Sequence, residues 1–196
     1  MATIAAAALR GGAEVLQLRQ KLLARGELLA LARRLRALTS DAGAIFVVND
    51  HVDLALLSEA DGVHRGAEDI SVVAARRIAG DRLLIGVSAS TPEAALAALE
   101  AGADYIGCGP AFATPLKPQK TVVGPSGVAD VTSGVGPSVA VFAIGGIDAT
   151  NIGQLTAAGV RRACVVRAVG EASDPEAAAR GLRAMLEARR SKAQAS

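Results

Sequence analysis

The sequence predicts an α/β fold, a parallel sheet curled into a TIM-type (β/α)8 barrel, on three observations. Short apolar segments alternate with longer amphipathic segments along the chain, which is the pattern of strands followed by helices. Polar and glycine-rich clusters directly follow the apolar segments, where the active-site loops of such barrels lie. No low-complexity linker or change in composition interrupts the 196 residues, which predicts a single domain over residues 1–196.

Seven apolar segments are predicted as strands. In chain order they cover residues 14–18, 44–48, 62–64, 83–87, 104–107, 139–144 and 162–166. Seven strand–helix units in one domain favour a barrel over an open sheet, but a closed barrel of this type needs eight strands. Residues 1–13 are predicted as a helix with no strand before it. The usual first strand is therefore expected to be missing, or replaced by a terminal segment or another chain, which would leave two strand edges exposed.

The segments between the strands show helical periodicity and helix-end signals. One face of the first long segment carries four leucines, Leu28, Leu31, Leu35 and Leu38. Three arginines of the same segment are expected to face solvent: Arg33, Arg34 and Arg36. Thr91 and Asp174 precede prolines and are predicted N-caps. Gly80, Gly102 and Gly159 follow alanine-rich stretches and are predicted to end helices.

Composition and charge exclude several classes of protein. The 21 basic and 19 acidic residues give a net charge of +2, and only 2% of residues are aromatic, so nucleic-acid binding is not expected. No apolar run reaches the roughly 18 residues of a membrane helix, and no basic residue precedes the apolar N-terminal stretch as in a secretory signal. A cytoplasmic protein is expected, with Cys108 and Cys164 as buried free thiols.

Basic side chains follow the first predicted strand. Arg19 and Lys21 alternate with other residues at the strand end, and the period of two places both on one face together with Gln17. Arginine binds phosphate through two parallel hydrogen bonds, and lysine adds a point charge. The alternative is a solvated surface pair, but Gln17 on the same face favours a phosphate site.

Two carboxylates follow neighbouring predicted strands. Asp50 comes directly after a predicted strand and Asn49, and Asp69 follows the next strand. Parallel neighbours would bring both carboxylates to one rim, and Mg²⁺ is commonly held by one or two carboxylates together with substrate phosphates. Each aspartate taken alone is more commonly a helix N-cap. The pair at equivalent positions is the reason for predicting a magnesium site.

Two loops complete the predicted rim. Gly145 and Gly146 end the sixth predicted strand, which becomes the seventh of eight if one is missing, and that is the usual place of a barrel's phosphate-binding loop. Lys117 lies in a long loop of the kind that forms lids or binding sites. The alternative for the glycine pair is a tight turn, and the alternative for Lys117 is a surface loop. His64 is predicted as a structural histidine, and His51 is given no role. Together, the basic residues, the two carboxylates and the glycine loop at one rim predict an enzyme that acts on a diphosphate-type substrate with magnesium.

As a set, these motifs resemble the thiamine-phosphate synthase family. The matching segments are residues 16–21, 49–50, 61–64, 68–69, 86–88, 104–110, 114, 117 and 143–147, in the family's order and over nearly the whole chain. The resemblance implies a TIM barrel that joins hydroxymethylpyrimidine diphosphate to thiazole phosphate, giving thiamine monophosphate and pyrophosphate. It also implies a dissociative mechanism, in which pyrophosphate leaves first and the thiazole nitrogen captures a pyrimidine carbocation.

The resemblance further implies roles for individual residues. The pyrimidine diphosphate would be held by Gln17, Arg19, Lys21, Asn49, Ser88 and Lys117, of which Arg19, Lys21, Ser88 and Lys117 would be catalytic. Asp50 and Asp69 would bind Mg²⁺, the implied cofactor. The thiazole phosphate would face Thr114, Gly146, Val166 and Arg167. The expected partners are the two small-molecule substrates and, in a homo-oligomer, a second copy of the chain.

Two residues depart from the family pattern, and they keep other functions in view. Leu116 stands where the family usually has Thr, and Arg167 where it usually has Ser. These departures and the absent strand favour a non-catalytic phosphate-binding homologue, which the retained diphosphate and metal residues oppose. A related thiazole tautomerase would need a catalytic His where this chain has Ser90, and would lack the two aspartates. A barrel acting on another phosphorylated small molecule would explain the glycine loop but not the paired aspartates, so the synthase is favoured.

Overall fold

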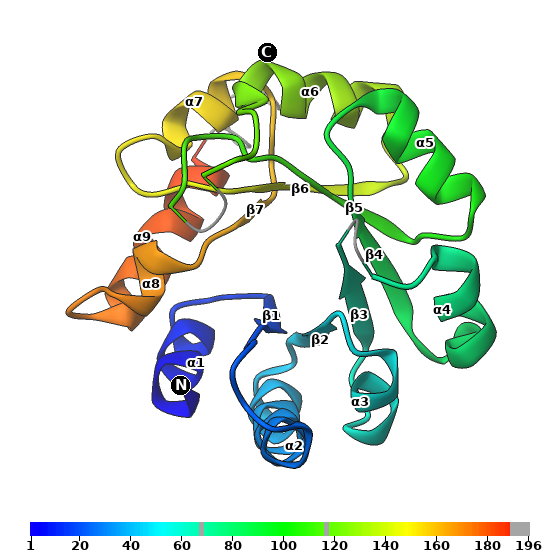
Figure 1. Ribbon diagram of the computed structural model, residues 1–196. Helices are drawn as coiled ribbons and strands as arrows, with labels where there is room; N and C mark the ends of the chain where they lie inside the picture. The colour runs from blue at the N-terminus through cyan, green and yellow to red at the C-terminus, as the bar shows by residue number, and fades with distance from the viewer. Residues whose placement is uncertain (67–68, 116–117, 189–196) are drawn as a thin grey trace.

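The computed structural model describes residues 1–66, 69–115 and 118–188, and its central feature is a seven-stranded parallel sheet. The strands are β1 (Val15–Leu18), β2 (Ile45–Asn49), β3 (Gly62–Arg65), β4 (Leu84–Ser88), β5 (Tyr105–Cys108), β6 (Ala140–Ile144) and β7 (Ala163–Cys164). Each strand pairs in parallel with its neighbour in sequence. The sheet curls with helices around its outer side, which confirms the predicted α/β barrel class without a closed barrel (Figure 1).

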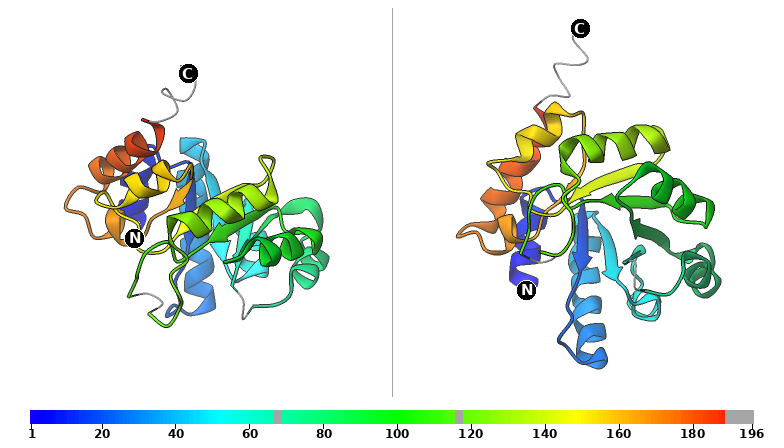
Figure 2. Two further views of the ribbon diagram at one scale, coloured as in Figure 1. Left: turned by 90° about the horizontal axis from the view of Figure 1, so that it is seen from above. Right: turned by 45° about the horizontal axis from the view of Figure 1, so that its top comes forward.

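Helices connect successive strands and surround the sheet, as the views in Figure 2 show. They are α1 (Ala2–Arg10), α2 (Arg25–Ala42), α3 (Val52–Leu57), α4 (Val72–Ala79), the 3₁₀ turn η1 (Gly80–Arg82), α5 (Pro92–Glu100), α6 (Gly124–Val135), α7 (Ile152–Ala157), α8 (Arg167–Gly170) and α9 (Pro175–Glu187). Among the described residues, no helix has the length and apolar character needed to span a bilayer.

The two ends of the sheet do not pair in the part of the chain that the structure describes, since β1 and β7 are edge strands. The ends of the chain are joined by helices instead, because α1 packs against both α9 and α2. Arg10 Nε donates to Glu176 Oε2 at 2.8 Å, and Arg183 Nη1 donates to the carbonyl oxygen of Gly12 at 2.8 Å. Gly11 lies so close to the backbone of α9 that a Cβ would collide with it. The helix predicted at the start of the chain is confirmed, and it fastens the two termini together.

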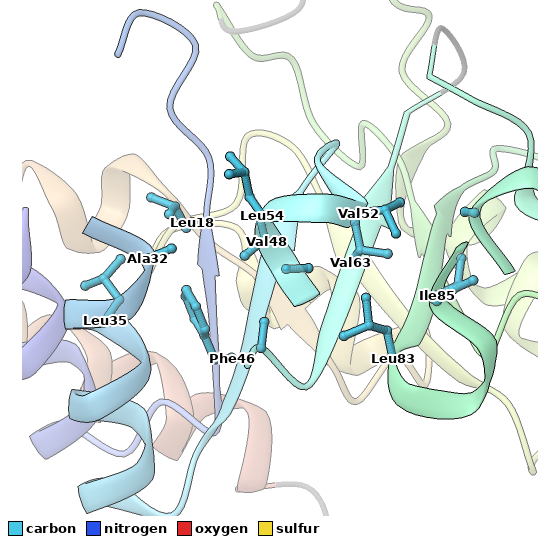
Figure 3. Packing of buried hydrophobic residues seen from close by; sticks show 14 of the residues in the cluster. Leu18, Ala32, Leu35, Phe46, Val48, Val52, Leu54, Val63, Leu83 and Ile85 are labelled. Carbon is cyan, nitrogen blue, oxygen red and sulfur yellow. The ribbon is translucent and has the colours of Figure 1, made fainter. Parts of the chain in front are cut away.

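Apolar side chains between the sheet and the helices form two core clusters, one around β1 to β4 and one around β5 to β7. In the first, Phe46 of β2 is 0% exposed and Leu35 of α2 is 2% exposed (Figure 3). Leu28 is buried with them, whereas Leu31 and Leu38 are partly buried against the same cluster. The leucine face predicted for this helix is therefore the face that covers the sheet.

Arg36 corrects the prediction that all three arginines of α2 face solvent. Its Nη1 donates to Asp61 Oδ2 at 2.8 Å, and the same oxygen accepts the N–H of Phe46 at 2.7 Å. The arrangement recurs two units later, where Asp104 Oδ2 accepts from Arg76 Nη2 at 2.6 Å and from the N–H of Ile85 at 2.7 Å. Each aspartate precedes one strand and accepts the N–H of the strand beside it. These carboxylates stabilise the amino ends of the strands, opposite the predicted rim.

The predicted strand bounds lie within about two residues of those observed, as is usual for element ends. The largest difference is the last strand, predicted over residues 162–166 and observed only at Ala163–Cys164. β7 pairs on one side only, and the chain leaves it to begin α8 at Arg167. Thr91 and Asp174 cap their helices as predicted, by accepting the N–H groups of Ala94 and Ala177. The predicted helix-ending glycines, Gly80, Gly102 and Gly159, all have positive φ.

The two cysteines are free thiols, as predicted. Cys108 is 0% exposed at the end of β5, and burial raises the pKa of its thiol to about 11. Cys164 lies on the short edge strand β7, where the residue as a whole is partly exposed, but its thiol is buried and burial raises its pKa as well. The prediction of buried thiols therefore holds for both.

Candidate active site

The carboxyl ends of β1 and β2 enclose a cavity of about 230 Å³. Its walls include three of the predicted site residues, Lys21, Asn49 and Asp50, together with Arg25 and His51. Because β1 and β2 are parallel, the loops that follow them leave the sheet at the same edge. The cavity therefore lies where barrel enzymes build their active sites.

Asp50 adopts a left-handed backbone conformation, with φ of 67°. Its N–H donates to the carbonyl oxygen of His64 on β3 at 2.8 Å, and the N–H of His51 donates to the carbonyl oxygen of Asn49 at 2.8 Å. This conformation costs about 1–2 kcal/mol for a residue with a side chain, although Asp and Asn tolerate it best. Hydrogen bonds to the neighbouring strand hold the turn, which places the Asp50 carboxyl group at the rim.

Asp50 and Asp69 lie close enough for the Asp69 carboxyl group to raise the pKa of Asp50, so the structure brings the two predicted metal residues together. Asp69 is fixed by its own loop, since its Oδ2 accepts the N–H of Gly66 at 2.6 Å. Burial raises the pKa of Asp50, and the hydrogen bond and charge of Asp69 raise it further, whereas the charges of Lys21 and His51 oppose the rise. Two neighbouring carboxylates repel each other when both are ionised, and a cation between them relieves that repulsion.

The oxygen donors of this pair fit a magnesium ion. Mg²⁺ prefers carboxylate, water and phosphate oxygens, and one or two carboxylates suffice when a substrate supplies the rest. Within residues 1–66, 69–115 and 118–188, no third His, Cys, Asp or Glu joins the pair into a larger cluster. A metal held by this pair would need water or substrate oxygens to complete its coordination.

Two further side chains lie near the pair, Arg25 and His51, and neither is predicted as a site residue from the sequence. Arg25 forms an ion pair with Asp53, and its Nη1 lies 3.3 Å from Nδ1 of His51. Arg25 is the first residue of α2, where a cation opposes the helix dipole. That unfavourable placement is the sequence signal that marks Arg25 as serving another purpose. His51 follows Asp50 directly, and its charge lowers the pKa of that carboxyl group.

Ser88 lies at the end of β4 within a hydrogen-bonded layer across three strands. Its Oγ is 3.0 Å from Nε2 of His64, and Nδ1 of the same histidine is 3.2 Å from the hydroxyl of Tyr105. His64 is 8% exposed, and burial raises the pKa of the Tyr105 hydroxyl well above its usual value. The layer fits the prediction of a structural His64, and this histidine also holds the predicted site residue Ser88.

The Gly145–Gly146 turn follows β6 and lies against the segment after β5. Both glycines have positive φ, 90° and 67°. The N–H of Phe112 donates to the carbonyl oxygen of Gly145 at 3.1 Å, and a Cβ on Gly146 would lie 2.5 Å from the carbonyl oxygen of Ala113. Only glycine fits this close approach. The next helix, α7, begins at Ile152, after a turn.

The other predicted residues are placed less centrally. β1 ends at Leu18, so the period of two does not extend to Arg19 and Lys21, both of which are exposed on the following loop. Gln17 is half-buried on the face of β1 opposite Leu18. The remaining predictions concern the thiazole side and the long loop.

Of the residues predicted to face the thiazole phosphate, Val166 is 59% exposed and Arg167 begins α8. Hydrogen bonds from Thr150 hold the pKa of Asp148 below its usual value, and the charge of Arg167 adds to this effect. The loops after β6 and β7 therefore approach each other. Thr114 lies in the long loop after β5, whereas Leu116 and Lys117 lie outside the described residues.

The fold and its rim together define the class of protein, an α/β-barrel enzyme with its site at the carboxyl ends of the strands. The family model described as thiamine monophosphate synthase matches residues 1–169. The chain therefore belongs to the thiamine monophosphate synthase family.

Individual relatives agree with the family model. The thiamine-phosphate synthase of Roseiflexus sp. (strain RS-1) is 44% identical over 184 residues, which are 93% of this chain and 77% of that protein. The thiamine-phosphate synthase of Gloeobacter violaceus is 46% identical over 168 residues, 86% of this chain, and this chain spans only 49% of its length. The solved thiamine phosphate pyrophosphorylase from Pyrococcus furiosus has a TM-score of 0.87 at 36% identity, over 95% of this chain and 89% of that one. The predicted family and its enzyme type, a transferase, are confirmed.

Proposed function

We propose that this chain joins hydroxymethylpyrimidine diphosphate to thiazole phosphate, giving thiamine monophosphate and pyrophosphate in a magnesium-dependent reaction. The observation that carries the proposal is the Asp50–Asp69 carboxyl pair, with Lys21 close enough to act on the charge of Asp50. Carboxylates for a metal and a cation for a diphosphate are the groups that departure of pyrophosphate requires. Lys21 and Asp50 line the rim cavity of a barrel from this family, and Asp69 lies next to Asp50.

The cationic side chains would stabilise the negative charge that develops on the leaving diphosphate. Lys21 lines the cavity beside Asn49 and Asp50, and Arg19 lies two residues before it on the same exposed loop. Lys117, in the family's position, would add a third cation. Asp50 and Asp69 would hold Mg²⁺, which when bound would neutralise further charge on the diphosphate oxygens.

The Ser88–His64 contact does not require a covalent mechanism. In a Ser–His–Asp triad a carboxylate orients the histidine through its Nδ1, but Nδ1 of His64 faces the Tyr105 hydroxyl. Ser88 would instead hydrogen-bond the pyrimidine diphosphate, with His64 holding its side chain. Ser90 is an exposed serine where the related tautomerase needs a histidine, so that alternative is not favoured.

The thiazole phosphate would bind between the loops that follow β5, β6 and β7. Gly146 exposes backbone at a turn held against residues 112–113, and Arg167 approaches the same region through Asp148. Thr114 and Val166 would complete this side of the site. Holding the thiazole nitrogen next to the pyrimidine would let it capture the carbocation before water does.

Phosphorylated substrates of this kind are confined to the compartment in which they are made, and we propose that the chain works in the cytoplasm. A homo-oligomer remains a prediction, which sedimentation of the purified chain would test. The reaction itself needs no protein partner.

Measurement of pyrophosphate release and thiamine monophosphate formation tests the function. Both substrates are supplied, with and without Mg²⁺, to the wild-type chain and to Asp50→Asn and Asp69→Asn. We expect magnesium-dependent turnover by the wild type and a loss of at least about 100-fold in each variant. Asp130→Asn, which removes an exposed carboxylate from α6, is the matched control and should retain activity. Full activity in folded Asp50→Asn would contradict the metal assignment, and absence of both products from the folded wild type would contradict the function.

A further inference from the structure

Arg65, the last residue of β3, is a buried cation that neither the family comparison nor the reaction accounts for. The residue is 4% exposed. Among the described residues, its Nε finds no hydrogen-bond acceptor. A buried N–H of a charged group that lacks an acceptor is costly and uncommon in folded proteins. A role for the charge itself would account for its presence.

The strand register places Arg65 beside the carboxyl pair. His64 pairs with Asn49 across β2 and β3, so the next residues along the two strands, Arg65 and Asp50, are neighbours. On the other side, Gly66 follows Arg65 directly and donates its N–H to Asp69 Oδ2 at 2.6 Å. Arg65 is therefore adjacent in structure to the segments that carry both aspartates.

The charges of Arg65, Asp50 and Asp69 influence one another although Arg65 forms no ion pair with either carboxylate of the described chain. Burial lowers the pKa of the Arg65 guanidinium, and the negative charges of Asp69 and Asp50 oppose that change. In the described part of the chain, Arg65 forms no direct ion pair with either carboxylate. An arginine remains protonated even in such surroundings. This part of the site therefore contains two carboxyl groups and, close to them, the permanently charged guanidinium of Arg65.

We propose that Arg65 is a positioning residue whose buried charge offsets the repulsion between Asp50 and Asp69 and weakens the binding of Mg²⁺ to the free enzyme. The inference rests on the proposed magnesium site. Arg65 is 4% exposed and its charge acts on both carboxylates, so its effect is expected through them. A metal ion that approaches the empty pair meets the repulsion of Arg65, whereas a metal ion that arrives with a diphosphate brings compensating negative charge. Arg65 therefore couples metal binding to diphosphate binding.

Calorimetric titration of the full chain tests this coupling. Mg²⁺ alone and a preformed magnesium–pyrophosphate complex are titrated separately into the wild type and into Arg65→Met, which keeps an unbranched apolar stem and removes the charge. We expect Arg65→Met to bind Mg²⁺ alone about tenfold more tightly than the wild type, a typical coupling between sites. The gain for the complex should be smaller. Arg77→Met removes an exposed arginine from α4 and should change neither affinity.

A second neutral variant, Arg65→Gln, is measured in parallel, and thermal melting identifies which variants are folded. Unchanged or weaker binding of Mg²⁺ by a folded neutral variant, with normal binding by the wild type, would overturn the role of Arg65 alone. Absence of binding to the wild type, even of the magnesium–pyrophosphate complex, would overturn the metal assignment and this inference with it. Tighter binding of both ligands by the same factor would also overturn the coupling.

Discussion

Replacing Asp61 by alanine should destabilise the fold without altering the active site. One carboxylate oxygen, Oδ2, accepts both the N–H of Phe46 at 2.7 Å and the guanidinium of Arg36 at 2.8 Å. The variant loses both bonds and leaves the N–H group of a fully buried residue without an acceptor. The side chains of Arg36 and Asp61 are 28% and 33% exposed, so the ion pair is partly screened by solvent.

The backbone bond should account for most of the effect. A buried donor that loses its partner costs about 1–3 kcal/mol, and a partly exposed ion pair contributes up to about 1 kcal/mol. We therefore expect the free energy of unfolding to fall by about 1–4 kcal/mol. With a urea dependence of about 1–3 kcal/mol per molar, the midpoint should fall by about 1 M.

Urea denaturation followed by circular dichroism measures this change, and turnover at 25 °C is measured on the same preparation. Glu187→Ala is the control, because it removes an exposed ion pair with Arg183 and should leave the midpoint unchanged. Asp104→Ala should resemble Asp61→Ala, since Asp104 makes the equivalent bonds to Ile85 and Arg76. A midpoint for Asp61→Ala equal to that of the control would refute the reasoning, and so would a loss of turnover in the folded variant.

Three further predictions concern individual residues. Gly146→Ala should lower stability by about 1–3 kcal/mol, because a φ of 67° is strained for a residue with a side chain and the new Cβ would collide with the carbonyl oxygen of Ala113. Gly153→Ala, where a Cβ would lie in open space, should be tolerated. Equal melting temperatures of the two variants would contradict this prediction. Cys108, whose pKa is about 11, should be about one-thousandth thiolate at pH 8 and should react with a thiol reagent only after denaturation; rapid labelling of the folded protein at this position would contradict its burial. Lys21→Met should lower kcat/KM by about 100-fold with no change in melting temperature, while Arg34→Met on the exposed side of α2 should be neutral; steady-state kinetics that do not separate these two variants would refute a role for Lys21 in the reaction.

The strands could be predicted because each buried strand has a local sequence pattern of its own. Each buried strand is a short apolar run between turn signals, and the runs around Phe46 and Ile85 define their strands to within about two residues. The fate of Arg36 was not predictable in this way. It has the same helical context as Arg33 and Arg34, and only the carboxylate of Asp61, 25 residues along the chain, distinguishes it.

The candidate site was predictable in its composition more than in its geometry. Asp50 and Asp69 follow neighbouring strands, so a parallel sheet was enough to predict that they would meet. Arg19 and Lys21 share a face with Gln17 only if the strand continues beyond Leu18, but the chain leaves the sheet there. Arg65 has no sequence signal, because a cation at a strand end looks the same whether loops cover it or leave it in solvent.

The contact between α1 and α9 has a consequence for how the molecule is assembled during synthesis. Each strand pairs with the one made just before it, so the sheet can grow one unit at a time as the chain leaves the ribosome. Arg10, by contrast, bonds to a residue 166 positions further along the chain. The first helix must therefore wait, with part of its apolar surface uncovered, until α9 has been made. Packing of α1 against α9 then comes after the sheet has formed, and until that step the waiting helix is exposed to chaperones and to misassembly.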